Sequence, residues 1–156
     1  MIAEIKFKNL LSFRDETIFS FEADNSKDMD SYHVVEIVPG VRLLKLAVIY
    51  GANASGKSNF IAVCDFIIDF LTRVPHTKKD ETGIVPFLLD DESNHETSDF
   101  NISFYVVREN QQPVKFIYSL SLTQSHIEKE SLAYYPSQQP AMIFERSMNH
   151  GVSDIK

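Results

Sequence analysis

Residues Gly51–Asn59 read GANASGKSN, and the predicted fold class rests mainly on this stretch. It fits the phosphate-binding pattern G-x-x-x-x-G-K-[ST], with Gly51, Gly56, Lys57 and Ser58 in the four fixed positions. Glycine at both ends lets the loop turn tightly and bring its N–H groups against phosphate oxygens, where a Cβ atom would obstruct the approach. The stretch therefore predicts a phosphate-binding loop.

The residues on either side of the loop support this interpretation. The run LLKLAVIY at 43–50 is apolar and β-branched, which predicts a buried parallel strand. The run SNFIAVCDFIIDFLTR at 58–73 predicts a helix that ends before Pro75. Strand, glycine loop and helix follow one another in the order that a nucleotide-binding P-loop requires.

The positions of the motif have separate expected roles. We expect Lys57 to place its ammonium near the β- and γ-phosphates of a nucleotide, and Ser58 to offer its hydroxyl to Mg²⁺. The helix that begins near Lys57 adds unpaired N–H groups and the positive end of its dipole. Lys57 is thus the candidate catalytic residue and Ser58 the candidate metal ligand. The candidate nucleotide-binding residues are Gly51, Ala52, Asn53, Ala54, Ser55, Gly56, Lys57, Ser58 and Asn59.

Composition limits the other functions that are open to the chain. A length of 156 residues with 44% hydrophobic content predicts a single core. The formal charge of −7 argues against a broad nucleic-acid surface, although a local basic patch stays open. The single cysteine, Cys64, excludes an internal disulfide framework and is expected to be buried in the helix. No membrane span and no signal pattern is found, so we expect a cytoplasmic protein.

Alternating apolar and polar residues predict strands outside the P-loop region. Residues 1–23 predict two antiparallel strands joined through 10–15, and residues 34–38 predict a short strand before a turn at Pro39-Gly40. From Asp99 the period of two returns and predicts an antiparallel meander with one apolar face. Its candidate strands are 100–106, 114–122, 127–135 and 142–144.

The helix after the loop carries apolar residues around most of its circumference, which predicts burial on more than one side. Asp65 and Asp69 mark a narrow polar face, and we interpret them as solvated rather than as a metal pair. The five histidines, His33, His76, His95, His126 and His150, lack metal-ligand spacing.

A second acidic motif offers an alternative mechanism. Residues 84–92 read IVPFLLDDE, which resembles a strand that carries a magnesium-binding and a catalytic carboxylate. In that interpretation Asp90 or Asp91 binds Mg²⁺ and Glu92 polarises water. Pro86 interrupts the run, as central strands rarely allow, so an apolar anchor followed by an exposed acidic loop is the favoured interpretation.

These segments together resemble a known family. IKFKNLLSFRDETIFSFEA followed by LAVIYGANASGKSNFIAV is similar to the N-terminal lobe of RecF/SMC-like ATPases of the ABC class, and closest to bacterial AAA-family proteins related to the OLD nucleases, many of them linked to phage defence. The K-N-x-x-S-F segment, Asn53 and Asn59 carry the resemblance. Ala54 stands where many such loops have glycine, and Leu11 stands where many relatives have a nucleotide-supporting arginine.

The resemblance implies an α/β fold: an ABC-ATPase-like P-loop NTPase N-terminal lobe with a mixed sheet, a buried post-P-loop helix and an antiparallel β meander. It implies ATP and Mg²⁺ as ligands, a homodimer through ATPase heads in a longer protein, and DNA-related work. We expect residues 1–156 to form one partial ATPase head lobe, with the hairpin, P-loop strand and helix in 1–98 and the antiparallel β subdomain in 99–146.

The resemblance also implies an L-S-x-G signature, an apolar strand ending in Asp-Glu, and a switch histidine. None of these motifs follows Phe144 in this sequence. We therefore expect the isolated chain to bind ATP and to hydrolyse it poorly. Two alternatives stay open. One is a self-contained small P-loop NTPase or kinase that uses Asp90, Asp91 and Glu92, and the other is a non-catalytic interaction module that docks through its meander.

Overall fold

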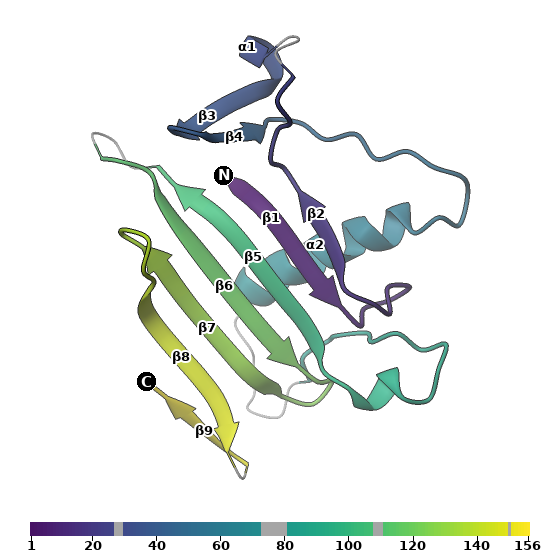
Figure 1. Ribbon diagram of the computed structural model, residues 1–156. Coiled ribbons are helices and arrows are strands. Elements are labelled where there is room, and N and C mark those ends of the chain that lie inside the picture. The colour runs from purple at the N-terminus through teal and green to yellow at the C-terminus, as the bar shows by residue number, and fades with distance from the viewer. Residues whose placement is uncertain (27–29, 73–80, 108–110, 150) are drawn as a thin grey trace.

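A large antiparallel sheet forms the body of the protein in a computed structural model (Figure 1). The structure describes residues 1–26, 30–72, 81–107, 111–149 and 151–156. Seven strands pair in the order β2-β1-β5-β6-β7-β8-β9. They are β1 (Ile2–Lys8), β2 (Thr17–Ser20), β5 (Ser98–Val106), β6 (Val114–Leu122), β7 (Ile127–Tyr135), β8 (Ala141–Asn149) and β9 (Val152–Ile155).

The opening hairpin and the later meander belong to the same sheet. β1 pairs with β2 on one side and with β5 on the other, so Ile5 lies opposite both Phe19 and Ile102. Every strand pairing among the described residues is antiparallel. The predicted hairpin and the four predicted strands of the meander are confirmed, whereas β9 was not predicted.

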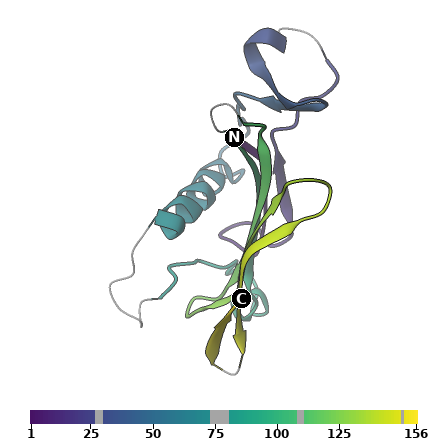
Figure 2. The same ribbon diagram turned by 90° about the vertical axis from the view of Figure 1, so that its left-hand side faces the viewer.

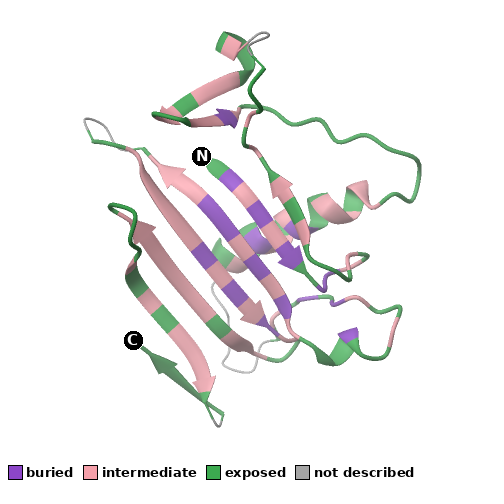
Figure 3. Ribbon diagram, viewed as in Figure 1, coloured by how far each residue is buried: buried purple, intermediate pink, exposed green. Residues whose placement is uncertain are grey.

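The core lies between one face of this sheet and the helix α2 (Lys57–Thr72), which crosses the sheet on that face (Figures 1 and 2). The buried positions of β1, β5 and β6 alternate along each strand, as Figure 3 shows. Phe66 of the helix stacks on Phe100 of β5 with ring centroids 5.6 Å apart. The fully buried core side chains include Phe7, Leu10, Val63, Leu120 and Leu122.

The prediction that α2 is buried on more than one side is wrong. Val63 and Ile67 are buried against the sheet, but Ile61, Ile68 and Leu71 are 54%, 60% and 53% exposed. No other element in the described part of the chain covers the face away from the sheet. One sheet can cover only one face of a helix, so the remaining apolar side chains stay exposed. Asp65 and Asp69 are exposed, as predicted.

The predicted parallel strand at 43–50 is also wrong. Only its first residues are in a strand, β4 (Val41–Leu44), which pairs antiparallel with β3 (Val34–Val38) as a separate two-stranded sheet. Residues 46–50 are extended chain without a strand partner among the described residues, and Val48 and Tyr50 are 76% and 90% exposed. A strand requires a neighbouring backbone with which to pair, and none of the described strands pairs with this segment.

The remaining predictions fare as follows. Strand 34–38 and the turn at Pro39-Gly40 are confirmed, and Gly40 has a φ of 83°. A short helix α1 (Asp30–His33), which was not predicted, precedes β3. The end of the long helix before Pro75 lies outside the described residues, as do His76 and His150. No described helix is long and apolar enough to cross a bilayer.

A polar cluster lies where the sheet extends beyond α2. Glu130 of β7 and Arg146 of β8 are opposite each other and form an ion pair with a 2.5 Å contact. The Tyr118 hydroxyl of β6 donates to the other oxygen of Glu130 at 2.7 Å. Burial, and then the hydrogen bond to Glu130, raise the pKa of Tyr118. The cluster thus pairs the charges that lie at the margin of the core.

Candidate nucleotide site

The P-loop has a compact, strained conformation just before α2. Ala54 has a φ of 62° and Gly56 a φ of 88°, both in the left-handed region that glycine adopts without penalty. A Cβ atom at Gly51 would lie 2.8 Å from the Ser55 hydroxyl oxygen. The positive φ explains why the motif requires glycine at position 56, whereas at Gly51 the close contact is with a side-chain hydroxyl that can rotate away. Ala54 occupies a conformation that costs it roughly 1 kcal/mol.

Lys57 folds back over the loop that precedes it. Its ammonium donates to the carbonyl oxygens of Gly51 at 2.9 Å and Ala52 at 2.6 Å. The Ser55 hydroxyl oxygen lies 3.4 Å away. Neutral carbonyls hold a cation less strongly than phosphate oxygens do, because hydrogen bonds between two charged groups are the stronger kind. The side chain can therefore exchange these partners for an anion in the loop.

Ser58 and the first turn of α2 face the same region. The intrahelical hydrogen bonds begin with Phe60, whose N–H donates to the Gly56 carbonyl at 2.9 Å. The N–H groups of the first turn have no carbonyl within the helix to which they can donate. Ser58 is exposed, so its hydroxyl is accessible to a cation that keeps most of its water. The donor set, one hydroxyl beside a phosphate cradle, fits Mg²⁺ that is held largely by the nucleotide.

The turn between β1 and β2 forms the second wall of the site. Ser12 and residues Ala54–Asn59 line one hollow of about 270 Å³. The Asn59 side-chain amide donates to the Ser12 hydroxyl oxygen at 2.8 Å. A Cβ atom on Gly56 would lie 3.5 Å from Cζ of Phe13 and 3.6 Å from the Ser12 oxygen. The loop and the turn are thus in direct contact, which the sequence did not predict.

Asn9 holds this turn in place from beneath. Its side chain is buried, with 1% exposed. Its amide donates to the carbonyl oxygens of Ser93 at 2.7 Å and Thr97 at 3.2 Å, while its Oδ1 accepts from the N–H of Phe87 at 3.0 Å. A φ of 57° lets the backbone reverse here. In the K-N-x-x-S-F segment, the asparagine therefore has a structural role and the serine faces the site.

The acidic residues of the alternative mechanism lie elsewhere. Asp90 accepts from the N–H of Ser93 at 2.7 Å and pairs with Arg14 at 3.0 Å. The hydrogen bond from the Ser93 backbone is the main cause that lowers the pKa of Asp90. Asp91 and Glu92 are exposed, and none of the three carboxylates lines the P-loop hollow. The interpretation of 84–92 as an apolar anchor before an exposed acidic segment holds only in part: Ile84 is 4% exposed, but Leu88 and Leu89 are 59% and 85% exposed.

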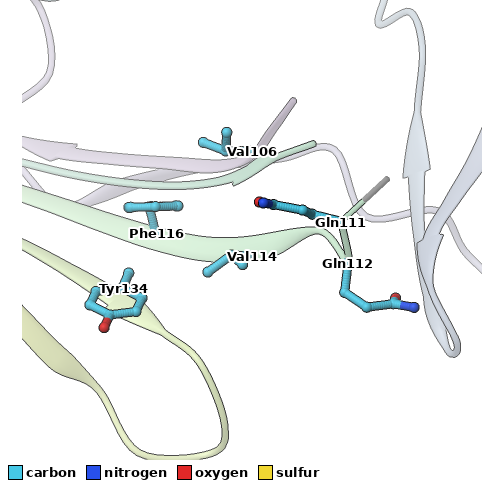
Figure 4. Close-up of a pocket in the computed structure, with 6 residues that line it drawn as sticks. All are labelled: Val106, Gln111, Gln112, Val114, Phe116 and Tyr134. Carbon is cyan, nitrogen blue, oxygen red and sulfur yellow. The ribbon is translucent and has the colours of Figure 1, made fainter. Parts of the chain in front are cut away.

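A second hollow, of about 240 Å³, has no chemistry suited to phosphate. It lies where β5 ends, β6 begins and β7 ends, and Figure 4 shows its lining side chains. Its lining residues are Val106, Gln111, Gln112, Val114, Phe116 and Tyr134. The rings of Phe104, Phe116 and Tyr134 stack in a row across the three strands. No cationic side chain of the described residues lines it, so this hollow is not suited to a nucleotide.

Cys64 and His126 are two further titratable residues, and the contacts of each are structural. Burial, and then the nearby carboxylate of Asp65, raise the pKa of Cys64, which suits a packed thiol rather than a nucleophile. His126 lies between Ser125 at 2.8 Å and Glu128 at 2.7 Å in the turn before β7. Within the described ranges, no group of three or more histidine, cysteine, aspartate or glutamate residues is arranged to hold a metal.

The glycine loop leads into a helix that packs on a sheet, as in a P-loop nucleotide-binding domain, although residues 46–50 before it are not in a strand. The model of the family described as "AAA domain, putative AbiEii toxin, Type IV TA system" matches residues 46–150, more than half of the 156 residues. The chain belongs to this family and is a P-loop AAA-type ATPase domain. No curated protein and no solved structure matches it.

Proposed function

We propose that this chain is the ATP-binding lobe of an ABC-class, RecF/SMC-like ATPase head. The observation that carries the proposal is the hollow shared by Ser12 and Ala54–Asn59, which combines a lysine, a helix N-terminus and a cation-accessible hydroxyl. The arrangement of the helix on an antiparallel sheet supports the ABC class rather than a small kinase. A kinase would surround its P-loop with parallel strands.

The site contributes binding and charge stabilisation to phosphoryl transfer. Lys57 and the loop N–H groups hold the phosphates and neutralise charge on the transferring group. Ser58 would hold Mg²⁺, which polarises the phosphoryl oxygens when bound. Of the residues described, no aspartate or glutamate lines the hollow. Water activation is therefore proposed to come from another part of the head.

Exposed apolar surface indicates where such a part would pack. Leu46 and Val48 of the segment before the loop are 65% and 76% exposed, and Ile68 and Leu71 lie on the uncovered face of α2. A soluble protein rarely leaves this much apolar surface in water without a partner. We propose that further strands of the ATPase head cover both regions, that two heads form a homodimer around ATP, and that the whole acts in DNA-related or phage-defence processes.

Steady-state hydrolysis by this chain tests whether water activation comes from another part of the head. We expect turnover far below about 1 s⁻¹, the lower range for enzymes of this kind. Glu92→Gln should leave the residual rate unchanged, because Glu92 does not line the site. Turnover above about 1 s⁻¹ that Glu92→Gln abolishes would instead support a self-contained enzyme. Full cellular function of a Lys57→Ala variant would support a non-catalytic interaction module.

A further inference from the structure

We propose that Ser12, in the turn between β1 and β2, is a nucleotide-binding residue whose hydroxyl donates a hydrogen bond to the α-phosphate. The inference rests on the proposed function, because it needs a nucleotide in the P-loop. It adds a contact from outside the G-x-x-x-x-G-K-[ST] motif, and from a segment that the family match at 46–150 does not cover.

The Asn59–Ser12 hydrogen bond runs from the asparagine amide to the serine oxygen. Asn59 supplies its amide nitrogen, Nδ2, so the Ser12 oxygen is the acceptor at 2.8 Å. The hydroxyl proton of Ser12 is therefore available to a second partner. A hydroxyl that accepts one hydrogen bond becomes a better donor for the next, because the two bonds polarise each other. The amide thus both positions the hydroxyl and strengthens it as a donor.

The Ser12 side chain lies at the hollow that the P-loop lines. Ser12 lines the same hollow as Gly56, Lys57 and Ser58. A Cβ atom built on Gly56 would lie 3.6 Å from the Ser12 oxygen, so the hydroxyl is above the backbone that cradles phosphate. The turn itself is fixed, since Leu10 and Phe13 exchange backbone hydrogen bonds of 2.8 and 2.7 Å.

The choice of the α-phosphate follows from where Lys57 and Ser12 contact the P-loop. The Lys57 ammonium lies at the Gly51–Ala52 start of the loop, bonded to both carbonyls, and this lysine is the group that reaches the β- and γ-phosphates. Ser12 is bonded to Asn59 at the other end, where the loop has already become helix. The backbone N–H groups of a P-loop hold the α- and β-phosphates, so the end away from the lysine is the α end.

Titrations with MgATP and MgADP, each read by calorimetry, test the inference on the whole chain. Ser12→Ala should lower the affinity for both nucleotides by the same factor, because both carry an α-phosphate. The factor should be roughly tenfold, which is what one hydrogen bond to a charged group contributes. Ser12→Thr keeps the hydroxyl and should restore binding. Ser153→Ala, on an exposed strand far along the chain, is the matched serine control. Ser12 is exposed, so its truncation leaves the core intact.

The outcomes separate this inference from the proposed function. If the unaltered chain binds neither nucleotide, the proposed function fails and the inference fails with it. If the unaltered chain binds both and Ser12→Ala binds both equally well, only the inference is overturned. Weakening of ATP alone would assign Ser12 to the γ-phosphate and overturn the α-phosphate assignment. A Ser12→Thr variant as weak as Ser12→Ala would show that side-chain size, not the hydroxyl, matters.

Discussion

Replacement of Asn9 tests how the candidate site is supported. Asn9 connects the turn that carries Ser12 to the segment 87–97, whose regular structure is a single 3-10 turn at Ser93–His95. Asn9→Ala removes the amide, leaves the N–H of Phe87 without its partner, and leaves the Ser93 carbonyl with only the 3.3 Å bond from the Glu96 N–H. It also places alanine at a φ of 57°, which asparagine tolerates better.

The cost follows from the contacts that are lost. The three shorter of its side-chain hydrogen bonds, to Ser93, Thr97 and Phe87, are worth about 1 kcal/mol each, and the 3.4 Å bond to the Glu96 carbonyl adds little. The left-handed conformation adds roughly 1 kcal/mol for alanine. We therefore expect Asn9→Ala to lower the free energy of unfolding by about 4 kcal/mol and Asn9→Gly, which has no φ penalty, by about 3 kcal/mol.

Urea unfolding of both variants measures these values. Asn101→Ala is the matched control, because the side-chain amide of Asn101 on the half-exposed sheet face donates only to the Ser119 hydroxyl, at 2.9 Å, and should cost at most about 1 kcal/mol. If Asn9→Ala costs no more than Asn101→Ala, the turn and the segment 87–97 are not held together by Asn9, and the explanation of the K-N-x-x-S-F segment fails.

Three further predictions concern the loop, the acidic segment and the helix. Gly56→Ala should destabilise the fold by about 1–2 kcal/mol in urea unfolding, since its φ is 88°, whereas Ala54→Gly should not destabilise it; equal effects would contradict the assigned strain. Glu92→Gln should leave MgATP affinity unchanged in a titration, and a loss of tenfold or more would return Glu92 to the site. Burial raises the pKa of Cys64, so its contribution to stability is full below the unfolded value of about 8.5 and is lost as the pH rises through the folded value. Comparison of urea midpoints for the unaltered chain and Cys64→Ala between pH 7 and 10 checks this, and parallel curves would contradict it.

Local patterns predicted most of the strands and the helix correctly. Alternation along β1, β5 and β6 shows directly which side chains face α2, because a period of two is a property of a single strand. The loop and helix were predictable for a similar reason, since the glycines, the lysine and the helix start lie within one short segment. These features depend little on what packs against them from far along the chain.

The failures involve partners that a local pattern does not specify. The run at 43–50 has the composition of a buried strand, but the described chain offers it no backbone with which to pair, and Tyr50 is 90% exposed. The outer face of α2 carries apolar residues, as the faces of a core helix do, but no element among the described residues covers it. Asn9 and Ser12 were recognisable only as letters of a motif. Their separate roles follow from contacts with Ser93 and Asn59, 84 and 47 residues away.

Equilibrium binding of MgATP tests the central claim most directly. We expect the chain to bind MgATP saturably, and Lys57→Ala to lose at least about tenfold in affinity while the urea midpoint stays unchanged, because the ammonium contacts only exposed loop atoms in the structure. Equal affinity of the two proteins, or no binding by the unaltered chain, would contradict the assignment of a nucleotide site to GANASGKSN.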